Sequence, residues 1–203
     1  MRLLLSASCL LLATAGCSFN DGENDEESTF EVGQLGSIVL QPQDVPRVFV
    51  RFDEGRQRTA DQPRGRSDPG RFGRERGWKA RYRRPGSPRT KGPLVIESRA
   101  DLFESSEGAK DELEASESEL AEADTAEGPP WQSIDAPSLG DDSFAMSGIQ
   151  PAFGGGVRSY LIVWREDNLT ASILANGFEG RFTLDEAMRL ARRQQARIAA
   201  SMS

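Results

Sequence analysis

The chain has 203 residues, with 32 acidic against 25 basic side chains, two cysteines and no histidine. The missing histidine excludes Ser-His-Asp and Cys-His catalytic sites, and it removes the commonest zinc ligand. Hydrophobic residues make up 37% of the chain, whereas globular domains average about 45–50%. We therefore expect one domain together with segments that do not pack against it.

Residues 1–16 have the layout of a secretory signal peptide, with Arg2, an apolar run and then small residues. As a helix the apolar run would span about 21 Å, which is shorter than the hydrocarbon core of ~30 Å. The stretch Leu12–Cys17, with Ala15 and Gly16 directly before the cysteine, resembles the lipobox of bacterial lipoproteins, although Thr14 replaces the usual leucine. The resemblance implies that the Cys17 thiol is diacylglycerylated and that cleavage leaves Cys17 as the first residue.

Ordinary signal cleavage after Ala13-Thr14-Ala15 is the alternative, and it would release a protein that begins at Gly16. Under the lipoprotein interpretation, Cys9 leaves with the signal peptide and Cys17 is acylated, so the mature domain holds no disulfide. The protein would then be anchored by lipid on the extracytoplasmic side of the cell membrane, or on the periplasmic face of an outer membrane.

Behind the anchor, residues 17–36 are expected to form an acidic, disordered tether, because Ser18–Gly33 carries six acidic residues and no basic one. Residues 37–203 are expected to form a single α+β domain. Within it, residues 55–77 have the composition of an arginine-rich loop.

Strands and helices can be assigned in chain order. Strands are predicted at Val48–Phe52, Trp78–Arg83 and Leu94–Ser98, a helix from Ser105 or Ser106 to Asp124, and a loosely extended segment over Trp131–Ile149. Tyr160–Trp164 and Leu169–Leu174 are predicted to form a hairpin whose turn places Asn168 in the left-handed region. Thr183 and Glu186 match a capping box that begins the final helix.

This order of elements predicts an antiparallel sheet with two helices packed on one face. One interpretation is that Trp78–Asp124 and Tyr160–Met202 are diverged copies of one ββα unit. The other is that the two halves merely share an outline.

Charge is strongly segregated along the chain. Arg47–Lys91 holds fifteen basic against five acidic residues, a net of +10, and Glu97–Glu127 has a net of −10. The basic segment either binds an anionic envelope polymer, lipid headgroups or a phosphorylated ligand, or it binds nothing. In the second case the two blocks neutralise each other or are simply solvated. The candidate anion-binding residues are Arg81, Arg83, Arg84, Arg89 and Lys91. Nucleic-acid binding is not expected, since no reader motif is present.

No catalytic residue, metal-ligand set or cofactor motif is found, so we expect a protein that is not an enzyme. Leu40–Pro46 looks like the entry motif of small extracytoplasmic domains in actinobacterial lipoproteins, and Tyr160–Arg165 with the final helix is similar to their closing elements. Some of those relatives are external sensor domains of receptor-type serine/threonine kinases, and they often carry cysteine pairs that this chain lacks. The resemblance implies a membrane-anchored domain that binds a ligand or a protein partner, and the alternative is a structural lipoprotein that contacts the envelope through residues 47–91.

Overall fold

The computed structural model describes residues 30–58, 68–122, 130–152 and 155–202. Residues 1–29, with the predicted signal peptide and Cys17, lie outside the described residues, as does the middle of the arginine-rich loop at 59–67. Within the part that is described, no helix is both long enough and apolar enough to cross a membrane.

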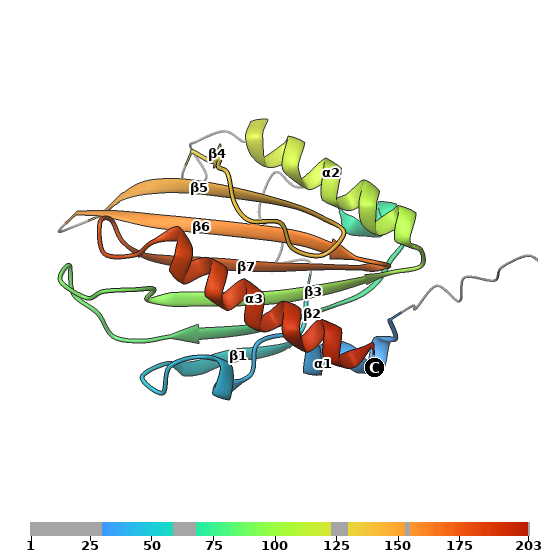
Figure 1. Cartoon of the computed structure of the whole chain (residues 1–203), viewed down its shortest axis with the longest axis horizontal. Coiled ribbons are helices and arrows are strands. Elements are labelled where there is room, and N and C mark those ends of the chain that lie inside the picture. The colour runs from blue at the N-terminus through green and yellow to red at the C-terminus, as the bar shows by residue number, and fades with distance from the viewer. Residues whose placement is uncertain (1–29, 59–67, 123–129, 153–154, 203) are drawn as a thin grey trace, which may run out of the picture.

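Seven strands form one antiparallel sheet in the order β1-β2-β3-β7-β6-β5-β4 (Figure 1). The strands are β1 (Val50–Arg56), β2 (Arg74–Arg83), β3 (Val95–Phe103), β4 (Gln132–Ser133), β5 (Asp142–Ala152), β6 (Gly155–Glu166) and β7 (Leu169–Phe178). The helices are α1 (Leu35–Ile38), α2 (Ser106–Glu122) and α3 (Leu184–Ser201). The pairing of β3 with β7 joins strands β1, β2 and β3 to strands β7, β6, β5 and β4.

The two long helices pack against opposite faces of this sheet. Leu113 and Leu120 of α2 cluster with Phe144, Met146 and Val163. Because side chains alternate along a strand, the next residues of β5 and β6 point to the other face. That face carries Ala145, Ile162 and Trp164, which belong to the same core as the buried residues of α3. The prediction that both helices lie on one face is therefore wrong.

The physical reason lies in the sequence of β6. Its run Tyr160–Trp164 is apolar on both faces, and such a strand needs cover on both sides. A strand with only one buried face alternates between apolar and polar residues, as Trp78–Arg83 does. The continuous apolar run was the sequence signal for a sheet between two helical layers.

The opposite placement of α2 and α3 also bears on the predicted repeat. Antiparallel neighbours such as β3 and β7 are related by a twofold axis normal to the sheet. A rotation about this axis exchanges the two strands but does not exchange the two faces of the sheet. Two ββα copies related in this way would place both helices on one face. The two halves therefore do not form a symmetric pair.

The fold begins earlier than residue 37. Phe30 and Leu35 are buried in the main core beside Ile38 and Val39, and the Phe30 amide donates to Asn168 Oδ1 at 2.9 Å. The expected tether through residue 36 is therefore too long, because Phe30, Val32 and Leu35 supply apolar surface that packs. The acidic side chain of Glu31 stays exposed between them.

Several predicted elements are confirmed, although their bounds differ. Helix α2 begins at Ser106, and the Thr183–Glu186 capping box begins α3 as expected. The arginine-rich loop is shorter than 55–77, since β1 runs to Arg56 and β2 already starts at Arg74. The segment predicted as loosely extended, Trp131–Ile149, contains β4 and most of β5. Pro151 of β5 lies beyond the two residues that pair with β4, where a missing amide costs no bond to that strand.

The hairpin between β6 and β7 forms as predicted, but the left-handed residue is Asp167, with φ of 52°, and not Asn168. Asp and Asn adopt this conformation more readily than other non-glycine residues, because a short polar side chain can bond to nearby backbone. Asn168 is instead buried, and its side chain bonds to other parts of the core.

Candidate functional site

Arg81, the first predicted anion-binding residue, lies in a row of opposite charges on the same face of the sheet as α2. Its Nη1 is 3.1 Å from Asp53 Oδ2, and its Nε bonds to Glu97. Lys79 also reaches Asp53, at 2.7 Å, and Arg99 bonds to the second oxygen of Glu97. Arg81 and Arg99 thus share the Glu97 carboxylate, and the Arg81–Glu97 pair joins the basic block to the acidic block. Asp53, the other partner of Arg81, belongs to the basic block itself.

Arg83 and Arg84 follow at the end of β2 and stack on aromatic rings. The Arg83 guanidinium lies 5.1 Å from the centre of the Phe52 ring, and that of Arg84 lies 5.2 Å from the centre of the Phe49 ring. Arg84 also donates to the Pro93 carbonyl at 2.7 Å and to the Lys91 carbonyl. Arg84 therefore holds the β2–β3 loop in place with donors that an anion would otherwise use.

Arg89 and Lys91 are exposed on this same loop. The structure thus brings Arg84, Arg89 and Lys91 together in one loop, with Arg83 on the strand just before it. Arg81 lies two residues before Arg83 on β2 and differs from the others in being held by carboxylates.

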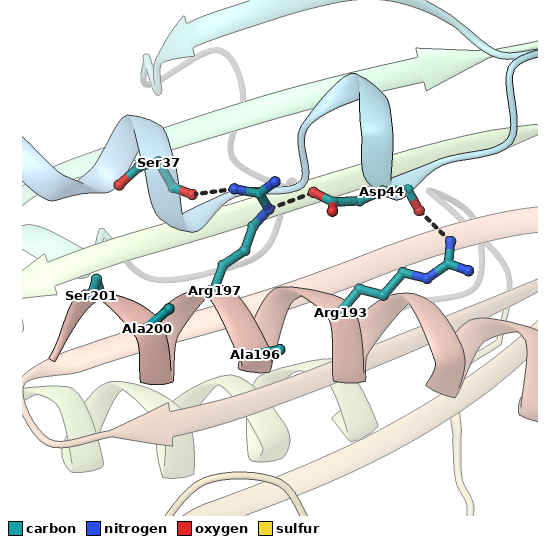
Figure 2. Close-up of a pocket in the computed structure, with 7 residues that line it drawn as sticks. All are labelled: Ser37, Asp44, Arg193, Ala196, Arg197, Ala200 and Ser201. Carbon is teal, nitrogen blue, oxygen red and sulfur yellow. Dashed lines mark hydrogen bonds and ion pairs between the residues drawn. The ribbon is translucent and has the colours of Figure 1, made fainter. Parts of the chain in front are cut away.

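A shallow groove of about 500 Å³ lies between α3 and residues 30–44, which we call the N-terminal segment (Figure 2). Its lining residues are Ser37, Asp44, Arg193, Ala196, Arg197, Ala200 and Ser201. Figure 2 shows the Arg197 guanidinium between the Ser37 carbonyl, at 3.3 Å, and the Asp44 carboxylate. Arg193 bonds to the Asp44 carbonyl, one turn of helix away.

Both arginines of the groove are therefore bonded to oxygens of the N-terminal segment. Gln34 adds a further bond, from its Nε2 to the Ser201 carbonyl at 3.0 Å. We call these contacts of Gln34, Ser37 and Asp44 with α3 the N-terminal latch. The latch fixes residues 34–44 to the last helix, and sequence reasoning missed it because its partners lie more than 140 residues apart.

A smaller cavity of about 210 Å³ lies beside β5, where residues 133–137 face Ser143, Ala145 and Ile162. Within the described ranges, no group of three or more His, Cys, Asp or Glu residues is placed to hold a metal ion.

The outer edge of the sheet at β1 carries exposed apolar side chains. Val48, Val50 and Phe52 are 52%, 63% and 45% exposed, whereas the intervening Phe49 is buried. The sequence predicts a strand here, but it did not show that this strand ends the sheet. We call Val48, Val50 and Phe52 the β1 patch.

No protein-family model matches the chain, and no curated protein matches it. Among solved structures, the extracellular domain of PknH from Mycobacterium tuberculosis is similar, with a TM-score of 0.63. The likeness covers 86% of this chain and 99% of that domain, at 10% sequence identity. At this identity the comparison shows that the two chains share a fold.

Proposed function

We propose that this protein is a lipid-anchored, extracytoplasmic domain that binds a ligand or a protein partner and catalyses no reaction. The observation that carries the proposal is the fold shared with an extracellular domain over 86% of the chain. The lipobox-like stretch that ends at Cys17 supports the same location independently.

The described charges also suit a binding domain. Arg81, Arg99 and Arg197 are held by carboxylates, and Arg83 and Arg84 stack on aromatic rings. Such contacts neutralise these charges or fix them in place within the fold.

The lipid anchor is tested by metabolic labelling of bacteria with an alkyne analogue of palmitate. We expect the wild-type chain to be labelled and to sediment with membranes, and Cys17→Ala to be unlabelled. Cys9→Ala is the matched control and should be labelled like the wild type, because Cys9 lies inside the predicted signal peptide. An unlabelled wild-type protein with Gly16 as its first residue would contradict the lipid anchor.

A second candidate function is contact with an anionic envelope polymer, which the exposure of Arg83, Arg89 and Lys91 near one end of the sheet favours. Replacing all three by Gln should weaken binding to polyphosphate, and added salt should weaken binding of the wild type. The control replaces Lys110, Arg189 and Arg192, which are also exposed but lie on α2 and α3. Equal binding by both triple variants would count against this candidate.

A further inference from the structure

Strand β1 ends the sheet and leaves main-chain groups without a partner strand on its outer side, among the residues that the structure describes. The Gln57 amide donates to the Gly77 carbonyl, which makes these two a hydrogen-bonded pair that continues the β1–β2 register. Since hydrogen-bonded and non-bonded pairs alternate in antiparallel strands, the amides and carbonyls of Glu54 and Arg56 point outward. Such an edge is a template for another strand.

The β1 patch lies at the start of this edge. Val50 pairs with Arg83, whose guanidinium lies over the Phe52 ring, so an apolar surface and a cation are adjacent. A register shift between Arg51 and Asp53 leaves Phe52 outside the regular pairing. Of the four large hydrophobic residues that are exposed in the described chain, three form this patch and the fourth is Met202.

The charges around the edge favour an acidic partner. Asp53 and Glu54 already pair with cations, with Lys79 at 2.7 Å and with Arg51 at 2.6 Å respectively. Arg47, Arg56 and Arg83 are exposed, and no described carboxylate forms an ion pair with them. The edge therefore combines open backbone groups, apolar side chains and unneutralised guanidinium groups.

We propose that β1 is a docking edge for an extended, acidic segment of a partner protein, which adds a strand to the sheet. The Glu54 and Arg56 main chains would bond to it, the β1 patch would take its apolar side chains, and Arg47 and Arg56 would meet its carboxylates. This names the mode of partner binding within the proposed function. It does not require the lipid anchor, so each can fail without the other.

Two other occupants fit the edge less well. A lipid phase cannot satisfy the outward amides and carbonyls of Glu54 and Arg56, and each such group is costly to bury there. A second copy of the chain would bring its own Arg47, Arg56 and Arg83 against the same cations, and like charges repel.

The test uses the whole purified chain in mild detergent and a capped peptide of alternating glutamate and valine. We expect the peptide to bind and to slow hydrogen exchange at the Glu54 and Arg56 amides, as measured by NMR. A peptide with lysine in place of glutamate should bind about tenfold more weakly, which corresponds to about 1.4 kcal/mol. A peptide with N-methylated alternate amides should lose binding, because it lacks the strand donors.

Variants of the edge make the test specific. Val50→Asp should weaken binding of the glutamate–valine peptide about tenfold, because it places a carboxylate in the apolar contact. Met202→Asp, the matched control at another exposed apolar residue, should bind like the wild type. The proposal is overturned if the peptide does not bind at millimolar concentration or if Val50→Asp binds it unchanged. The proposal is also overturned if the peptide protects amides elsewhere and not those of Glu54 and Arg56. The same holds if Val50 is needed for binding to phosphatidylglycerol vesicles but not to the peptide, or if sedimentation shows dimers that form through β1.

Discussion

Asn168 joins three parts of the chain through one buried amide. Its Oδ1 accepts from the Phe30 amide at 2.9 Å, and its Nδ2 donates to the Phe103 carbonyl at 3.1 Å. Its own carbonyl accepts from the Phe103 amide, also at 2.9 Å. The residue therefore ties the N-terminal segment to the adjacent ends of β3 and β7.

Replacing Asn168 by Ala should lower the free energy of unfolding by about 1–3 kcal/mol, because the buried Phe30 amide loses its acceptor. Urea denaturation measures the change. Gln150→Ala, on an exposed part of β5, should leave the stability within about 0.5 kcal/mol of the wild type. An equal effect of both substitutions would show that the Asn168 bonds contribute nothing.

Tyr82 is fully buried and donates to the Leu40 carbonyl at 2.6 Å. Burial raises the pKa of its hydroxyl above the ordinary 10.0, and the nearby Arg51 opposes this rise. A raised folded-state pKa gives stability that is fully present below pH 10.0 and is lost as the pH rises through the folded-state value.

We therefore expect the free energy of unfolding to fall as the pH rises above 10.0. Tyr82→Phe removes the ionisable group, so its stability should fall less steeply over the same range, even though the variant starts from a lower value at neutral pH. Urea denaturation at several pH values compares the two slopes. Identical slopes would show that Tyr82 titrates alike in the folded and unfolded chains.

At the scale of elements, α3 contacts the sheet through the buried Gln194 and the N-terminal segment through Arg193 and Arg197. Gln194 is buried and accepts from the Ser98 hydroxyl at 2.8 Å, and its Nε2 donates to the Arg99 carbonyl at 2.7 Å. The Ser98 hydroxyl in turn accepts from the Leu40 amide. Arg193 and Arg197 hold the N-terminal latch. Helix α3 therefore connects the N-terminal segment to the middle of β3.

Removing the latch should loosen the N-terminal segment before the sheet. Arg197→Met should lower stability by about 1–2 kcal/mol, between the values for exposed and buried ion pairs. It should also speed amide exchange of residues 34–44 more than that of β3. Arg192→Met, at an exposed residue of the same helix, is the control and should change neither quantity. If exchange rose equally everywhere, Arg197 would stabilise the whole fold and not the latch.

At the scale of the whole molecule, the sheet lies between α2 on one face and the layer of α1 and α3 on the other. Its centre is β3 with β7, each hydrogen-bonded to a strand on both sides. Its ends are β1 and the two-residue β4. The edges thus have fewer main-chain bonds and less apolar cover than the centre.

Hydrogen exchange followed by mass spectrometry should show this gradient directly. We expect peptides from β3 and β7 to exchange slowest, and those from β1 and β4 fastest among the strands. The physical reason is that central amides open only with global unfolding, whereas edge amides open locally. Exchange of β1 as slow as that of β7 in the isolated protein would contradict an open β1 edge.

The local elements of this protein could be predicted from its sequence because their signals are local. The Thr183–Glu186 capping box, the β6–β7 hairpin and the helix at Ser106 each depend on residues a few positions apart. Alternation in Trp78–Arg83 likewise indicated that Ala80 and Tyr82 are buried, but Trp78 is only half-buried and Lys79 on the polar face is buried as well. The lipid anchor at Cys17 lies outside the described residues and stays a prediction.

The tertiary structure decided which strand ends the sheet, which face each helix covers and what the arginines contact. Arg81 was a candidate anion-binding residue until the fold brought Glu97 beside it, and the predicted strand Val48–Phe52 had no place in the sheet until β1 proved to be an edge that leaves Phe52 exposed. Pairing between strands and the partners of long charged side chains depend on residues far apart in the chain. No local pattern specifies them, because burial and neutralisation are properties of the assembled sheet.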